Sequence, residues 1–179
     1  MAVKLLPPCD YVRQLLDYNP ENGAFAWLPR PRDMFNSLRA YAVWNAKYAG
    51  KRAGCIQQDG YRIINIHSSL YLAHRLAWLL VYGEPIPSEL DHIDRNKLNN
   101  RIDNLREATR AQNIANAGAR KNNTLGIRGV HRWQGKYRAR IEINRKSISL
   151  GMFDTAEEAG MAYREAAGGA HGEFAYGDA

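Results

Sequence analysis

The chain has 179 residues, 45% of them hydrophobic, so it can bury one large or two small cores. Lysine and arginine outnumber aspartate and glutamate by 25 to 18, and the resulting net charge of +7 suggests an anionic partner, most simply nucleic acid. The composition excludes other classes: Cys9 and Cys55 form no Cys-x-x-Cys pair for a zinc site, the apolar run Leu76–Tyr82 is too short to span a bilayer, and we recognise no secretion signal.

The first 58 residues predict a region that leads into the rest of the fold. A short helix is expected over Asp10–Leu16, followed by a turn at Asn19–Gly23 and a strand over Ala24–Leu28. Trp27 and Trp44 are expected to pack, although stacking on a base is an alternative for them. The sequence assigns no function to this region.

The next segment predicts two strands and a helix. Tyr61–Ile66 alternates as a strand, the polar residues after it make a turn, and Leu70–Leu72 returns. Ala73–Tyr82 then predicts a helix that Gly83 ends.

A polar segment from Leu90 to Asn116 has the composition of a site rather than of a core. Asp91 stands next to His92, an Asn-Leu-Arg triplet begins at Asn104, and a helix carrying Asn113 follows. A carboxylate, an imidazole and two amides are groups that metal-assisted phosphodiester hydrolysis uses. The alternatives are structural, because Asp91 could cap a turn and the other asparagines of the loop suit turns.

The composition changes again after Asn116. Residues 118–123 form a polar, basic linker, in which Arg120 and Lys121 are candidate phosphate contacts. A first strand is expected over Gly126–Trp133. Tyr137–Ile143 and Ser147–Leu150 predict two further strands, joined by a tight turn. A capping box at Thr155–Glu158 begins a helix that Gly168 and Gly169 are expected to end.

Charge in this last region is divided between its elements. Residues 119–150 hold nine Lys or Arg and one acid, whereas residues 151–179 hold one Arg and six acids. A basic sheet face with an acidic helix behind it is suited to binding DNA. The phosphates would attract the sheet face and repel the helix, so the helix would be turned away from the DNA. The alternative is a solvated strand face without a partner.

Residues from about 61 to 116 resemble the HNH, or His-Me finger, endonucleases of phages and mobile introns. The motifs that carry the resemblance are Ala73–Leu76, Asp91–Asp94, Asn99–Arg101, Asn104–Arg106 and Gln112–Asn113. The resemblance implies a ββα-metal fold around one divalent ion, expected to be Mg²⁺ with Mn²⁺ as an alternative. It implies Asp91 and Asn113 as ligands, His92 as general base and Asn104 as the amide that orients the imidazole. Asn100 is a second candidate for that amide.

Residues from about 126 to 177 resemble an AP2 DNA-binding domain. The matching motifs are Arg128–Val130, Gly135–Tyr137, Leu150–Phe153, Thr155–Ala159 and Ala162–Tyr163. The resemblance implies a three-stranded antiparallel sheet packed on one helix, with the sheet on duplex DNA. Charge and position make the following residues candidate DNA contacts: Arg128, His131, Arg132, Lys136, Arg138 and Arg140.

Some residues of the HNH-like segment allow two interpretations. His74 lies on an apolar helix, which favours a core histidine over a ligand. Arg75 and Arg101 could contact phosphate or pair with acids such as Glu89 or Asp103. Arg95 stands at a loop position where many members of the family carry glycine, so a positive φ would cost about 1 kcal/mol unless the side chain reaches DNA.

Together these features predict an α+β protein with an N-terminal region (1–58), a nuclease module (59–117), a linker (118–123) and a DNA-binding domain (124–179). We expect a phage homing-type endonuclease in the bacterial cytoplasm, without a membrane partner, as a monomer with a dimer as the alternative. It would cut double-stranded DNA, as a nick or a double-strand break, leaving 5′-phosphate and 3′-hydroxyl ends. The alternatives are a non-catalytic AP2-type DNA-binding regulator and a protein that binds or cleaves RNA.

Overall fold

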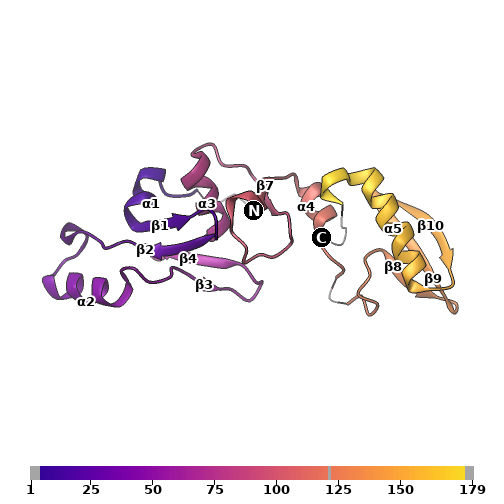
Figure 1. Ribbon diagram of the computed structural model, residues 1–179, viewed down its shortest axis with the longest axis horizontal. Coiled ribbons are helices and arrows are strands. Elements are labelled where there is room, and N and C mark those ends of the chain that lie inside the picture. Colours follow the sequence, from indigo (N-terminus) through magenta and orange to yellow (C-terminus); the bar gives the residue numbers. More distant parts are fainter. Residues whose placement is uncertain (1–4, 121, 176–179) are drawn as a thin grey trace. The chain divides into compact units, whose positions relative to one another are not determined.

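The computed structural model describes residues 5–120 and 122–175 and divides the chain into two compact units (Figure 1). The N-terminal unit covers residues 1–107 and the C-terminal unit residues 108–179. The helix at 110–116, which the sequence analysis groups with the nuclease module, lies in the C-terminal unit of this division. No helix of the described ranges is long and apolar enough to cross a membrane.

The N-terminal unit consists of short elements in small antiparallel sheets. In chain order they are α1 (Cys9–Leu15), β1 (Leu16–Asn19), β2 (Ala24–Trp27), η1 (Arg32–Met34), α2 (Leu38–Tyr48), β3 (Cys55–Ile56), β4 (Arg62–Ile66), β5 (Ser69–Leu72), α3 (Ala73–Tyr82), β6 (Leu90–His92), η2 (Ile102–Asn104) and β7 (Leu105–Glu107). The strands form the hairpins β1–β2 and β6–β7 and the sheet β3–β4–β5. The strands and helices expected between residues 10 and 82 are confirmed to within one or two residues.

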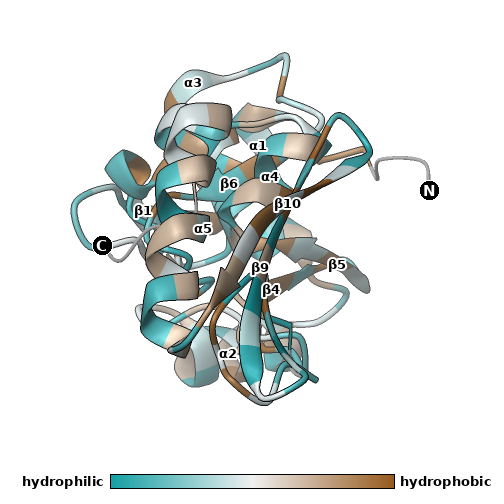
Figure 2. Cartoon of the chain, turned by 90° about the vertical axis from the view of Figure 1, so that its right-hand side faces the viewer, coloured by the Kyte–Doolittle hydropathy of each residue, from teal (hydrophilic) through white to brown (hydrophobic). Residues whose placement is uncertain are grey.

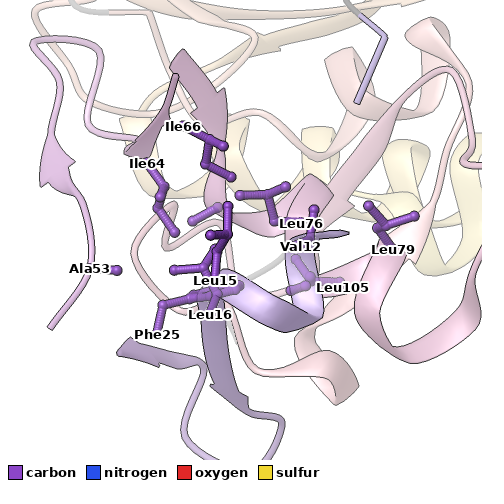
Figure 3. Close-up of a cluster of buried hydrophobic side chains, with 12 residues drawn as sticks. Val12, Leu15, Leu16, Phe25, Ala53, Ile64, Ile66, Leu76, Leu79 and Leu105 are labelled. Atoms are coloured by element: carbon purple, nitrogen blue, oxygen red, sulfur yellow. The ribbon is translucent and has the colours of Figure 1, made fainter. Parts of the chain in front are cut away.

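One hydrophobic core joins the first and last parts of this unit (Figure 3). Its fully buried side chains come from α1, β2, β4 and α3, and Leu105 of β7 completes it. The region before residue 58 is therefore an integral part of the N-terminal unit. Gly83 adopts φ 74° after α3 and ends that helix as expected.

The C-terminal unit is a three-stranded sheet with helices. Its elements are α4 (Arg110–Asn116), β8 (Val130–Trp133), β9 (Lys136–Ile143), β10 (Lys146–Phe153), α5 (Ala156–His171) and η3 (Gly172–Phe174). The antiparallel order is β10–β9–β8, and α5 packs against β9 and β10 (Figure 2). This arrangement agrees with the expected sheet and helix, although β8 is shorter than predicted.

Two details of the C-terminal unit differ from expectation. Helix α5 runs through Gly168 and Gly169 and ends at His171, followed by Gly172 at φ 54°. The burial of Ala167 beside Tyr163 outweighs the weak helix propensity of the two glycines. Helix α4 belongs to this unit because its buried Ala115 packs in a small cluster with Phe174 of η3.

Candidate functional site

The β6–β7 hairpin places a carboxylate opposite a guanidinium. Asp91 and Arg106 are cross-strand partners, and Arg106 donates from Nε and from a terminal nitrogen to Asp91 Oδ2 at 3.0 and 2.9 Å. Their side chains are only 9% and 13% exposed, and a carboxylate so far from water requires a positive partner. Sequence reasoning identified Asp91 but missed this ion pair, because the pairing depends on strand register.

His92 follows Asp91 and is also buried. Its Nε2 lies 3.3 Å from Oδ1 of Asn100, and Nδ2 of Asn100 donates to the Leu98 carbonyl at 3.3 Å, which fixes the orientation of the amide. Because an amide oxygen only accepts, this contact assigns the ring hydrogen to Nε2 and leaves Nδ1 as the basic nitrogen. Burial lowers the pKa of His92, although Asn100 and the nearby aspartates favour the charged form. The imidazole is therefore neutral near pH 7, as a general base must be.

Asn104 is connected to a different part of the site. Its Oδ1 accepts from the Asp94 N–H at 3.0 Å, while its Nδ2 donates to Asp94 Oδ1 at 2.9 Å and to the Asn99 carbonyl at 2.8 Å. The amide beside the imidazole is therefore that of Asn100, the second candidate from the sequence. Asn104 instead holds the loop that carries Asn100. Burial opposes the charge of Asp94, but the amides of Asn99 and Asn104 keep its pKa below its ordinary value.

Aromatic rings surround the imidazole. The rings of His74 and His92 meet edge to face at 5.0 Å, and the Tyr61 ring lies 5.4 Å from His74 and 6.0 Å from His92. His74 is 6% exposed, and burial, followed by the charges of His92 and Arg75, lowers its pKa to about 3. These contacts agree with the core interpretation of His74. Tyr61, which sequence reasoning did not select, completes this wall.

The three arginines considered for phosphate have different surroundings. Arg75 donates to the carbonyls of Pro87 and Ser88 at 3.0 and 3.2 Å, and Arg101 pairs with Asp103 at 2.7 Å. Arg95 has φ 65°, the left-handed conformation that its loop position suggested. Of the two roles that the sequence allowed for Arg101, contact with phosphate or pairing with a nearby acid, the structure shows the pairing with Asp103.

In the C-terminal unit, most of the candidate DNA contacts lie on one face of the sheet. Ala139 and Ile141 of β9 are buried, so the alternating Arg138 and Arg140 project from the opposite face. His131 pairs with Arg138 across the strands and lies on the same face. Trp133 lies under the Arg138 guanidinium, whose carbon is 4.8 Å from the ring centroid. The exposed face of the sheet is therefore both basic and aromatic.

The remaining candidates have individual partners. Arg128 donates to the Ala115 carbonyl at 2.7 Å and to that of Ala117, so it holds the end of α4. Lys136 pairs with Asp154 at 2.9 Å. Arg132 donates to the Tyr137 hydroxyl at 3.1 Å. Arg120 is exposed, whereas Lys121 lies outside the described residues.

The donor chemistry of the implied metal site fits a hard cation. Asp91 offers a buried carboxylate, and Asn113 of α4 offers an amide oxygen. Asn113 belongs to the C-terminal unit, so its pairing with Asp91 stays a prediction. Within residues 5–120 and 122–175, no group of three or more His, Cys, Asp or Glu is arranged to hold a metal. Cys9 and Cys55 are both free thiols.

Comparisons with known proteins agree with this site. A family profile described as HNH endonuclease matches residues 71–115. The chain is 36% identical over 104 residues to an uncharacterized HNH endonuclease of Acanthamoeba polyphaga mimivirus, covering 57% of this chain and about half (54%) of that protein's length. It is 34% identical over 107 residues to Protein 3.8 of Escherichia phage T7, covering 57% of this chain and 86% of that protein.

No solved structure matches the chain. The profile covers the segment from β5 to α4, which contains Asp91, His92, Asn100 and Asn104. The phage relative is matched over most of its own length, at an identity above 30%. The segment 71–115, which contains the buried Asp91–His92 pair, is therefore similar to the HNH endonuclease family.

Proposed function

We propose that this protein is a metal-dependent endonuclease of the homing type that hydrolyses phosphodiester bonds in double-stranded DNA. The observation that carries the proposal is the contact of His92 Nε2 with Asn100 Oδ1, directly after the buried carboxylate of Asp91. A neutral imidazole with one nitrogen fixed and a carboxylate beside it are the groups that phosphodiester hydrolysis requires. The matching HNH endonuclease profile and the mimivirus relative named an HNH endonuclease support the same assignment.

In the proposed reaction, Nδ1 of His92 accepts a proton from a water molecule, and the resulting hydroxide attacks phosphorus in line. The bond from phosphorus to the 3′ oxygen breaks and the leaving oxygen takes a proton from a second water molecule, which leaves a 5′-phosphate and a 3′-hydroxyl. A divalent cation on Asp91 and Asn113, expected to be Mg²⁺ with Mn²⁺ as an alternative, would supply positive charge at the leaving oxygen. Asn100 holds the ring, and Asn104 holds the loop that carries Asn100.

We further propose that the C-terminal sheet places the nuclease on duplex DNA in the manner of an AP2 domain. The supporting observation is the exposed basic face that carries His131, Arg138 and Arg140. Such a face attracts phosphates, and a sheet can enter the major groove. Arg128 is assigned to the fold instead, because it donates to the carbonyls at the end of α4.

The test is incubation of the purified protein with supercoiled plasmid in Mg²⁺ or in EDTA. Conversion to open circles in Mg²⁺ alone is expected from a nicking enzyme, and linear product would show paired cuts. His92→Ala should abolish cleavage and leave DNA binding within about twofold. The matched control is His67→Ala, because His67 is an exposed histidine that stacks on Tyr11. Salt-sensitive DNA binding without cleavage in any metal would replace the proposal with a non-catalytic regulator.

A further inference from the structure

Residues 29–52 form a projection on the N-terminal unit, here named the arm. It leaves the unit after β2, contains η1 and α2, and returns before the buried Ala53 (Figure 1). Helix α2 has 11 residues and none of them is buried. Leu38 is 71% exposed and Val43 58% exposed, although most helices of this length hide their large apolar side chains. The arm thus presents a helix that the hydrophobic core does not require.

The base of the arm is firmly attached to the unit. The Asn45 side chain accepts from the Arg30 N–H at 2.9 Å and donates to the Arg30 carbonyl at 3.0 Å. The Arg30 guanidinium carbon lies 4.0 Å from the Trp44 ring centroid and 5.1 Å from that of Trp27. An isolated bridge also pairs Trp27 with Ala49. These contacts fix the orientation of α2, so one face of the helix is held toward solvent.

Charge distinguishes the arm from an ordinary exposed helix. It carries six cationic side chains and a single acid, Asp33, and α2 contains no acid. The cationic residues are Arg30, Arg32, Arg39, Lys47, Lys51 and Arg52. All of them except Arg30 are exposed. Solvent-exposed helices usually mix both signs of charge, so a helix without acids is suited to an anionic surface.

The outer face of α2 combines this charge with small side chains. Tyr41, Trp44 and Tyr48 share the side of the helix that faces the base of the arm. Helical periodicity therefore places Arg39 and Val43 on the opposite side, and Lys47 at the edge of that side, where its Nζ lies 5.0 Å from the centroid of the Tyr48 ring. Ala42 and Ala46 lie beside Arg39 on this face and are also exposed. Because alanine side chains are small, a phosphate backbone can approach this face closely.

We propose that the outer face of the arm binds the phosphate backbone of duplex DNA, as a second contact on the nuclease unit itself. The inference rests on the proposed function, since it takes duplex DNA as the substrate. It gives residues 29–52 a role, which the sequence left open, and it does not depend on the C-terminal sheet. A second copy of the chain is a poorer fit, because two arms with this charge would repel each other.

The experiment measures binding of a fluorescent DNA duplex by full-length protein in the His92→Ala background, over a range of salt concentrations. Arg39→Ala and Lys47→Ala each remove one cation and leave the helix intact, because alanine is the best helix former. The matched control is Arg13→Ala, which removes one exposed cation from α1 of the same unit. Circular dichroism and the unfolding midpoint check that all the variants remain folded.

Each arm variant is expected to lower the slope of log K against log salt by about 1, and the affinity by about tenfold near 0.1 M salt. The double variant should show about twice the change in slope, and Arg13→Ala should bind within about twofold of the His92→Ala parent. Arm variants that bind as tightly as Arg13→Ala would overturn the inference. So would a dimer in sedimentation velocity that the arm variants dissociate.

The outcomes separate this inference from the proposed nuclease function. If the wild-type protein cuts plasmid and the arm variants bind DNA as the control does, only the role of the arm fails. If no metal supports cleavage but the arm variants lose affinity, only the nuclease proposal fails. Absence of any duplex binding by the His92→Ala protein would overturn the inference whatever the plasmid assay shows.

Discussion

The Tyr18 hydroxyl donates to the backbone carbonyl of Asn100 at 2.7 Å, which ties the first hairpin of the chain to the residue that contacts His92. The turn of the same hairpin reaches this segment at Gly23, where a Cβ would lie 2.5 Å from the Arg101 nitrogen. The Ile102 N–H also donates to the Pro20 carbonyl at 3.1 Å. The β1–β2 hairpin therefore supports the loop that positions the imidazole.

Tyr18→Phe is expected to lower the cleavage rate severalfold and the free energy of unfolding by about 1 kcal/mol, because it removes one hydrogen-bond donor from a half-buried carbonyl. Burial, with smaller contributions from Asp103 and Tyr82, raises the pKa of Tyr18 to about 12, so the hydroxyl is a donor throughout the useful pH range. The measurement is single-turnover cleavage beside urea unfolding. Tyr82→Phe is the control, because Tyr82 is 59% exposed. Equal rates in both variants would contradict the supporting role of the hairpin.

Asn100→Ala is expected to affect mainly the cleavage rate, whereas Asn104→Ala is expected to affect mainly the free energy of unfolding. Asn100→Ala removes the acceptor that fixes the imidazole and should lower the cleavage rate by tenfold or more. Asn104→Ala removes three hydrogen bonds within the loop and should lower the free energy of unfolding by about 3 kcal/mol. Cleavage is measured well below the unfolding midpoint of both variants. A normal rate in Asn100→Ala with a large loss in Asn104→Ala would favour Asn104 as the amide that orients the imidazole.

The buried His74 makes stability depend on pH. Its pKa is about 3 in the folded protein and near 6.5 when unfolded, so between these values the unfolded state binds the extra proton. The stability that His74 contributes is present above about pH 6.5 and declines as the pH falls toward 3, by at most about 1.4 kcal/mol per pH unit. His74→Phe should flatten urea unfolding free energies between pH 5 and 7. Parallel curves for the two proteins would disprove this.

Two glycines of the C-terminal unit offer a matched test of packing. Gly129 and Gly135 have φ of 72° and 78°, so alanine is strained equally at both, by about 1 kcal/mol. A Cβ at Gly129 would lie 2.1 Å from the Tyr163 ring and 2.6 Å from the Arg140 carbonyl, whereas nothing lies within 4 Å at Gly135. Gly129→Ala should therefore lower the unfolding midpoint of this unit by several degrees more than Gly135→Ala. Equal midpoints would contradict the close packing of Gly129 against Tyr163 and the Arg140 carbonyl.

Much of the local structure followed from the sequence because it depends on neighbouring residues. The alternation in β9, the capping box of α5 and the ends of α3 are all short-range features, and the structure confirms each one. The adjacency of Asp91 and His92 was also visible, because the two residues are consecutive in the sequence. Both lie in strand β6.

The sequence by itself determined which residue types could perform phosphodiester chemistry and which elements carry them. Only the tertiary structure decided that Asn100 meets the imidazole, that Arg106 pairs with Asp91, and that the first hairpin supports Asn100. The physical reason is separation along the chain. Tyr18 and Asn100 are 82 residues apart, so their contact depends on how the whole core packs rather than on any local pattern.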